Sequence, residues 1–168
     1  LVGCGGSGDS ADSPAPATES ATSYASGPIS GFGSVIVNGV RYDDSSATVL
    51  DDDDGGRRRD ELRLGMMVEV DGAQMNRAAA LGKALRIRFG SEIVGPVGSV
   101  DVASGTLVVL GQTVQTTATT VFDDSLAGGL AALTAGTVVE VHALFDAATG
   151  RYIATRIEDE DEDNTSFY

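Results

Sequence analysis

Residues 34–42, Ser-Val-Ile-Val-Asn-Gly-Val-Arg-Tyr, decide the fold class of this chain. Two short apolar stretches flank Asn38-Gly39, and this dipeptide suits a two-residue turn because both of its positions need a positive φ. The pattern predicts a β-hairpin. In Val139-Glu140-Val141-His142-Ala143, the alternation places the three apolar side chains toward a core. Strands are expected at Ser34–Val37, Val40–Tyr42, Val68–Val70, Leu85–Phe89, Val97–Val102, Thr106–Leu110, Val138–Leu144 and Tyr152–Ile157. We therefore predict an all-β protein.

The chain contains an internal repeat, because four short motifs occur twice in the same order. The second copies lie 65, 72, 71 and 70 residues after the first copies. The jump from 65 to 72 predicts an insertion near Asp101 to Thr106, and the repeat as a whole predicts units at 29–90 and 91–157. The motif pairs are Gly33-Ser34-Val35 with Gly98-Ser99-Val100, Thr48-Val49-Leu50-Asp51 with Thr120-Val121-Phe122-Asp123, Leu64–Val70 with Gly136–Val141, and Ala84–Ile87 with Ala154–Ile157.

Each unit combines short strands with one helical or irregular stretch, at Arg57–Leu64 and at Ser125–Leu133. Gly65 and Gly136 follow these stretches, as glycine commonly does at the end of a helix. About five strands and one helical turn in about 65 residues predict a small barrel, which leaves few exposed strand edges. The oligonucleotide/oligosaccharide-binding (OB) barrel is the closest architecture, with an SH3-like barrel or a small sandwich as alternatives. Units this small are marginal alone, so the two are expected to pack together or to pack on further copies of the unit.

Charge and composition exclude some partners. The 168 residues include 25 acidic and 11 basic side chains, for a net charge of −14. Nucleic-acid binding relies on Lys and Arg that neutralise phosphates, so no nucleic-acid partner is expected.

The two ends of the chain differ in composition from its body. Residues 1–28 are rich in small and polar residues and predict a disordered tether, whereas residues 158–168 form an acidic tail.

The single cysteine, Cys4, stands in the sequence Leu1-Val2-Gly3-Cys4. These four residues resemble a bacterial lipobox, in which the cysteine carries the lipid of a lipoprotein. The resemblance implies lipidation of Cys4, a membrane contact through that lipid, and a place in the bacterial cell envelope. Gly5 after the cysteine favours the outer membrane by the same resemblance. The alternatives are an incidental exposed cysteine and a secreted protein.

The repeat itself resembles the bacterial domain of unknown function 5666 (DUF5666) family. The similarity is carried by Gly31–Val40, by Val109–Val114 and by Gly136–Val141, and it extends over about 130 of the 168 residues. These motifs consist of structural glycines and core valines, so the resemblance implies a fold rather than an activity. It carries over no catalytic residues. The segment Asp51–Asp60 is unusually charged for its place in the family pattern.

Few residues qualify as a chemical site. Asp51, Asp52, Asp53 and Asp54 are weak calcium candidates, because calcium loops place carboxylates before a glycine. The three arginines that follow them favour a loop that neutralises its own charge. His142 is the only histidine, and it is expected to be exposed on its strand. We therefore predict no catalytic residue, no cofactor and no established metal site.

Three functional hypotheses follow. The first is a non-enzymatic, lipid-anchored envelope protein that displays tandem barrels as a structural or binding module. The second is an OB-like barrel that recognises an oligosaccharide or a protein partner, for which clustered exposed aromatic side chains would be evidence. The third is an enzyme, for which a pocket that gathers titratable groups would be evidence. Self-association is compatible with each of them.

Overall fold

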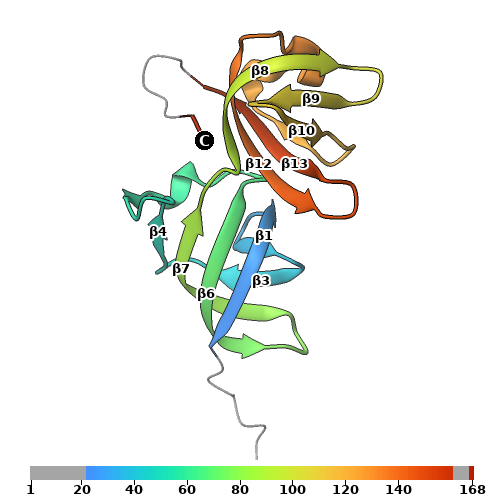
Figure 1. Cartoon of the computed structure of the whole chain (residues 1–168). Coiled ribbons are helices and arrows are strands. Elements are labelled where there is room, and N and C mark those ends of the chain that lie inside the picture. Colours follow the sequence, from blue (N-terminus) through green and yellow to red (C-terminus); the bar gives the residue numbers. More distant parts are fainter. Residues whose placement is uncertain (1–21, 161–166) are drawn as a thin grey trace, which may run out of the picture.

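The computed structural model describes residues 22–160 and 167–168. Cys4 and most of the predicted tether lie outside the described residues, as does most of the acidic tail. The described chain forms two β-barrels in tandem, joined by a short connection between β7 and β8 (Figure 1). None of its helices is long and apolar enough to cross a membrane.

The first barrel is a closed ring of five strands. The strand order β3-β2-β1-β6-β7 is closed by parallel pairing of β3 with β7, while β4 and β5 extend the sheet beyond the ring. Its elements are β1 (Ser23–Gly31), β2 (Val35–Val37), β3 (Val40–Asp43), β4 (Thr48–Leu50), β5 (Gly56–Arg57), the 3₁₀ turn η1 (Arg59–Glu61), β6 (Met67–Asn76) and β7 (Leu81–Phe89).

The second barrel repeats this topology. Its ring has the order β10-β9-β8-β12-β13 and is closed by parallel pairing of β10 with β13. The elements are β8 (Ile93–Asp101), β9 (Thr106–Val109), β10 (Gln112–Gln115), β11 (Val121–Phe122), η2 (Asp124–Leu126), η3 (Gly129–Ala132), β12 (Val138–Asp146) and β13 (Arg151–Asp159). The prediction of two tandem OB-like units, each with five barrel strands and a short helical turn, is confirmed.

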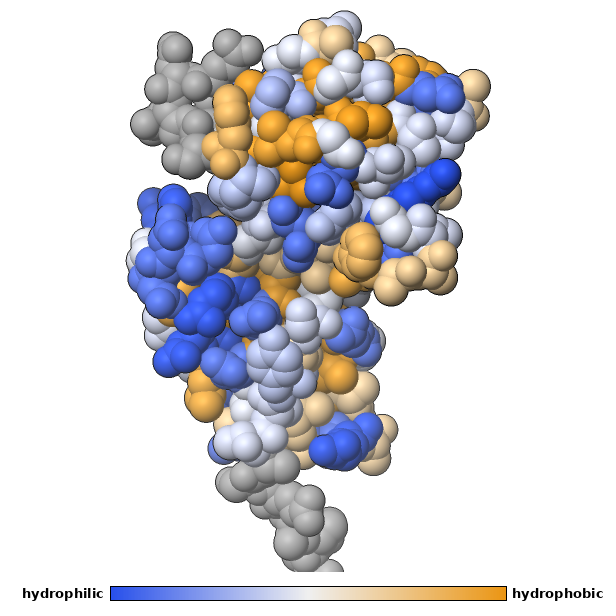
Figure 2. Space-filling view, in the orientation of Figure 1, coloured by the Kyte–Doolittle hydropathy of each residue, from blue (hydrophilic) through white to orange (hydrophobic). Residues whose placement is uncertain are grey.

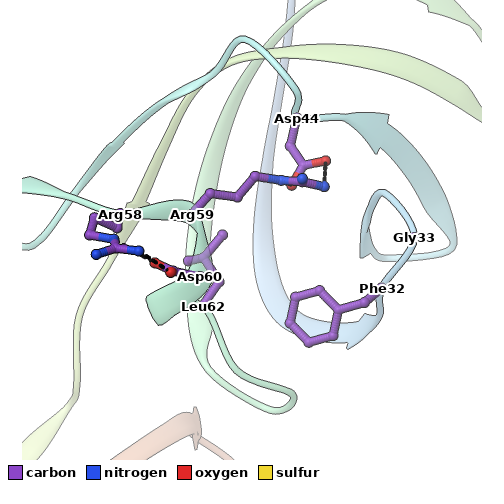
Figure 3. Close-up of a pocket in the computed structure, with 7 residues that line it drawn as sticks. All are labelled: Phe32, Gly33, Asp44, Arg58, Arg59, Asp60 and Leu62. Carbon is purple, nitrogen blue, oxygen red and sulfur yellow. Dashed lines mark hydrogen bonds and ion pairs between the residues drawn. The ribbon is translucent and has the colours of Figure 1, made fainter.

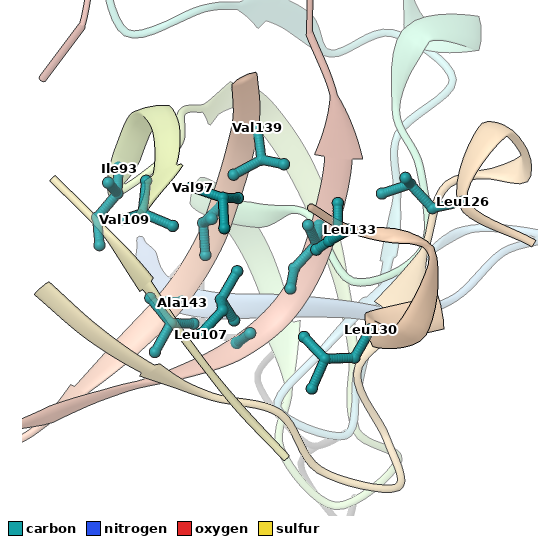
Figure 4. Close-up of a cluster of buried hydrophobic side chains, with 13 residues drawn as sticks. Ile93, Val97, Leu107, Val109, Leu126, Leu130, Leu133, Val139 and Ala143 are labelled. Carbon is teal, nitrogen blue, oxygen red and sulfur yellow. The ribbon is translucent and has the colours of Figure 1, made fainter. Parts of the chain in front are cut away.

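Each barrel has its own apolar core, built from alternate residues of its strands. In the first unit Val35, Val37 and Val70 are fully buried. In the second, Val139, Val141 and Ala143 face inward as predicted (Figure 4 shows Val139 and Ala143). Because the ring of strands is closed, the strands that enclose these side chains also pair their backbone groups with one another.

The hairpins confirm one predicted turn and correct another. Asn38 and Gly39 have φ of 51° and 77°, as a two-residue turn requires. The equivalent turn of the second unit is Leu110-Gly111, with φ of 48° and 79°, so Leu110 is not the last residue of a strand. Leucine rarely adopts a positive φ, and the sequence therefore concealed this turn.

The first motif pair of the repeat is wrong, although the position of the insertion is right. Ile29 pairs with Val37, and Val97 pairs with Val109. Equivalent residues are therefore 68 apart in β1 and β8, and 72 apart in β2 and β9. Gly33 lies in the turn after β1, whereas Gly98 lies within β8. The extra residues fall within 100–106 and lengthen the β8–β9 hairpin, which is where the insertion was expected.

Two unit boundaries also differ from the prediction. β1 begins at Ser23, six residues before the expected start of the unit, and it pairs with β6 from Ser23↔Gly72 onward. The side chains in this part of β1 show no clear apolar alternation, so the sequence pattern did not predict it. Its pairing with the backbone of β6 makes it a strand. At the other end β13 continues to Asp159, and Tyr168 exchanges two backbone hydrogen bonds with Val94. Parts of the predicted tether and tail thus belong to the folded body.

Candidate ligand site in the first barrel

The two barrels differ most at the 3₁₀ turn that leads into the fourth ring strand. Leu62 and Leu133 end these turns at equivalent positions, and each donates its backbone N–H to the residue three before it. That residue is Leu130 in the second unit and Arg59 in the first. Gly65 and Gly136 then follow, with φ of 83° and 95°, as predicted for glycines at this place.

In the second unit this end of the barrel is filled by leucines. Leu126, Leu130 and Leu133 are all buried in the core of the barrel (Figure 4). In the first unit only Leu62 is buried there, and η1 itself buries no residue. The barrel end that is plugged in one copy is therefore open in the other.

The open end forms a hollow of about 570 Å³. Its lining combines one aromatic ring, one leucine and two pairs of opposite charge around one space (Figure 3). The lining residues are Phe32, Gly33, Asp44, Arg58, Arg59, Asp60 and Leu62. A concave surface with apolar walls and a few fixed polar groups is the usual form of a small-ligand site.

The Asp44–Arg59 pair closes the hollow on one side. Arg59 donates from Nε to Asp44 Oδ2 at 2.5 Å and from Nη2 to Oδ1 at 2.8 Å. The Asp44 side chain is 2% exposed, whereas that of Arg59 is 54% exposed. The hydrogen bond to Asp44 raises the pKa of Arg59 further. A two-bond contact of this kind fixes the guanidinium plane and leaves one of its edges facing the hollow.

Phe32 supplies the aromatic wall. It follows the last residue of β1, and Gly33 turns the chain toward β2 with φ of 109°. The ring is 50% exposed although phenylalanine is apolar. Figure 3 shows this ring beside Leu62 and the Asp44–Arg59 pair. The hollow therefore presents an accessible ring face next to a fixed polar edge.

His142 occupies a different place from the one predicted. It was expected to be exposed, but its side chain is fully buried where the two barrels meet. Nδ1 lies 2.8 Å from the carbonyl oxygen of Gly90 and 3.3 Å from the backbone nitrogen of Met67. Burial lowers the pKa of His142. The outward face of β12 is covered by the first unit, and a pattern within one strand cannot indicate such a contact.

A second pocket at this junction gathers acidic side chains, a feature that favours the enzyme hypothesis. It has a volume of about 350 Å³, and its walls include Asp52, Glu140 and Glu160. The pKa of Glu140 is raised, mainly by burial and also by the charges of Glu158 and Asp52. Hydrogen bonds to Glu160 and Ser91 act in the opposite direction. Glu140 and its two hydrogen-bond partners belong to the second unit and Asp52 to the first, so the pocket lies between the units and its carboxylates repel one another.

The four calcium candidates are divided among several partners. Asp51 accepts hydrogen bonds from Arg57 and from the backbone of Gly55, and Asp54 is paired with Arg88. Asp52 lies 3.4 Å from the Tyr168 hydroxyl. Within 22–160 and 167–168, no three acidic, histidine or cysteine side chains are grouped to hold a metal ion. Cys4, the predicted lipidation site, lies outside these residues.

Two stretches of the chain, residues 26–80 and 94–158, match the family model described as "Domain of unknown function (DUF5666)". The chain belongs to the DUF5666 family. The second match covers nearly all of the second barrel, whereas the first match ends before β7; the 3₁₀ turns of both DUF5666 units lie inside the matched stretches. The resemblance to DUF5666 in the sequence is thereby confirmed. No curated protein and no solved structure matches this DUF5666 protein.

The sequence alone does not single out Phe32 or Arg59 as site residues. One signal was available, since the segment 51–60 is unusually charged for a DUF5666 unit. Its arginines do not simply neutralise the neighbouring aspartates, because Arg59 reaches back to Asp44. The informative comparison is between the two copies, in which Arg59 takes the place of Leu130.

Proposed function

We propose that this protein is a non-enzymatic, lipid-anchored component of the bacterial cell envelope whose first barrel binds an oligosaccharide. The tandem DUF5666 barrels are consistent with a structural or binding module. The hollow beside Phe32 is the observation that favours a binding role, because the second copy of the same fold fills this place with leucines.

The chemistry of the hollow suits a sugar. A sugar ring has an apolar face of C–H groups and an edge of hydroxyl groups. The half-exposed ring of Phe32 and the side chain of Leu62 offer an apolar surface for that face. The guanidinium of Arg59 is held in place by Asp44, so its free edge can meet hydroxyl groups with little loss of conformational entropy.

A protein partner is the alternative, and it has an observation of its own. Leu144 and Phe145, at the end of β12, are 47% and 58% exposed, and Phe145 lies 5.1 Å from the Tyr152 ring between centroids. Exposed aromatic side chains are common at protein interfaces. This pair belongs to the second unit, so a variant at each place separates the two roles.

Replacement of Phe32 by alanine is expected to weaken oligosaccharide binding about tenfold, equivalent to about 1.4 kcal/mol, because the apolar wall is lost. The measurement is calorimetric titration of the full chain carrying Cys4→Ser against a panel of neutral and acidic tetrasaccharides. Phe145→Ala is the matched control, since it removes an exposed ring from the other barrel. If Phe32→Ala bound the oligosaccharide as tightly as the parent chain, the hollow would not be the binding site.

The lipid anchor is tested on the protein from its native cells. Intact-mass analysis of detergent-extracted envelopes is expected to give a chain that begins at Cys4 and carries a diacylglyceryl and an acyl group. The Cys4→Ser form should lose this mass and leave the membrane fraction. An unmodified native chain in the soluble fraction would contradict the anchor and favour a secreted binding protein.

A further inference from the structure

The positive charges of this acidic protein are gathered in one barrel. Strongly hydrophilic residues cover one side of this first barrel, the lower one in the view of Figure 2. Nine of the 11 Lys and Arg residues lie between residues 41 and 88, and only Arg151 and Arg156 lie in the second unit. Residues 22–90 contain 10 acidic side chains, so the first unit is close to neutral. Residues 91–168 contain 12 acidic side chains against those two arginines, and therefore carry most of the net negative charge.

Within the first unit, the lining of the hollow has as many guanidinium groups as carboxylates, and two further arginines lie next to residues of that lining. The two arginines in its lining are matched by two aspartates, since Arg59 pairs with Asp44 and Arg58 with Asp60. Arg41 and Arg63 do not line the hollow, but each neighbours residues that do, and both are exposed. Arg41 Nη1 is 3.8 Å from where a Cβ on Gly33 would stand. Arg63 Nη1 donates to the carbonyl oxygens of Asp60 and Leu62.

These two arginines differ from the lining pairs in one respect. In the described part of the chain, neither Arg41 nor Arg63 forms an ion pair with a carboxylate. Arg63 is oriented by backbone carbonyls, which leave its positive charge uncompensated. Guanidinium groups are suited to carboxylates because two parallel N–H donors match the two oxygens. Two guanidinium groups without a carboxylate partner thus lie next to lining residues of the hollow, where they can meet an anionic group.

We propose that the hollow selects an acidic sugar, of the uronic acid class, whose carboxylate is bound by Arg41 and Arg63 while its ring lies against Phe32. This inference rests on the proposed oligosaccharide-binding function and specifies its ligand. The carboxylate would engage Arg41 and Arg63, the arginines that neighbour the lining of the hollow without an ion pair, and the sugar ring accounts for the exposed aromatic side chain. A long polyanion does not fit equally well, because the second unit repels it at low ionic strength. A short acidic oligosaccharide meets mainly the charges within about 8 Å at physiological salt.

The test compares tetragalacturonate with its carboxyl-reduced, neutral counterpart by calorimetric titration of the full chain carrying Cys4→Ser. The acidic tetrasaccharide is expected to bind at least tenfold more tightly. Arg41→Gln with Arg63→Gln should remove this difference and leave the affinity for the neutral sugar within twofold. Arg151→Gln is the control, because it removes an arginine from the other barrel. Circular dichroism spectra confirm that each variant is folded.

Each outcome has a separate meaning. Equal binding of the acidic and neutral sugars would overturn the acidic-sugar inference and leave the proposed function in place. Binding of neither sugar, or of any sugar in the neutral and acidic panel, would overturn the proposed function and with it the inference. Equally tight binding of tetraglutamate would show that charge alone is recognised, which also overturns the inference. If Arg151→Gln also lost the preference for the acidic sugar, that preference would depend on net charge rather than on the hollow, and the inference would be overturned.

Discussion

Replacement of Arg59 by leucine is expected to lower the free energy of unfolding of the first barrel by about 3 kcal/mol, although leucine is the residue at the equivalent place in the second barrel. The reason is Asp44, whose side chain is 2% exposed and whose two oxygens are both bound by Arg59. Loss of the guanidinium leaves a buried carboxylate without its positive partner. Equilibrium urea unfolding followed by circular dichroism measures the change.

The matched control copies both residues of the second unit. Asp44 is equivalent to Thr116, because β3 and β10 are 72 residues apart along their length. Asp44→Thr combined with Arg59→Leu removes the buried charge together with its partner, and it is expected to recover most of the lost stability. It should also fill the hollow and abolish sugar binding. If the double variant were no more stable than Arg59→Leu alone, the buried carboxylate would not be the cause.

Replacement of Gly65 by alanine is expected to separate the two barrels. Gly65 has φ of 83°, and a Cβ there would lie 2.5 Å from the carbonyl oxygen of Thr155 in the second unit. A backbone atom cannot move aside without moving β13. The nearby bond from Arg156 Nη1 to the carbonyl of Leu64, 3.2 Å long, would be lost with it. We expect a destabilisation well above the 1–2 kcal/mol of left-handed strain alone, about 3 kcal/mol or more.

Gly136 provides the comparison, because the duplication places it at the equivalent position. Its φ is 95°, but a Cβ there would meet no atom within 4 Å. Gly136→Ala should therefore cost only the strain, about 1–2 kcal/mol. Scanning calorimetry measures both variants, and hydrogen exchange of the Met67 amide, which bonds to His142, reports on the junction. Similar losses in the two variants, with unchanged exchange at Met67, would contradict a role for Gly65 at the interface.

Much of the fold is predictable from the sequence because it depends on local chemistry. Asn38-Gly39 tolerates the positive φ of a tight turn, and the apolar alternation of β12 identifies the inward face. The same logic fails at Leu110, whose positive φ is imposed by the closed barrel and opposes its own preference. The start of β1 could not be predicted either, since its pairing with β6 depends on backbone groups that every residue carries.

The site was less predictable because it depends on contacts between distant segments. His142 is polar and alternates with core residues, and only the neighbouring barrel explains its burial. The pair of Asp44 with Arg59 joins residues 15 apart across an irregular connection, where no periodicity applies. Phe32 gave no signal, because an apolar residue after a strand is ordinarily a core residue. Nothing in a single strand or turn shows that its ring is half exposed.

The difference between a plugged and an open barrel end has a consequence for how such proteins diversify. The order of the five ring strands is the same in both copies, and at this barrel end the change lies in the 3₁₀ turn and the residue after β3. After a duplication, one copy can preserve a fully packed scaffold while the other accumulates substitutions at a place that no strand pairing depends on. A small number of replacements then suffices to create, retune or erase a recognition site. The same property makes the second barrel a starting point for engineering a new specificity, with Leu126 and Leu130 as the first positions to change.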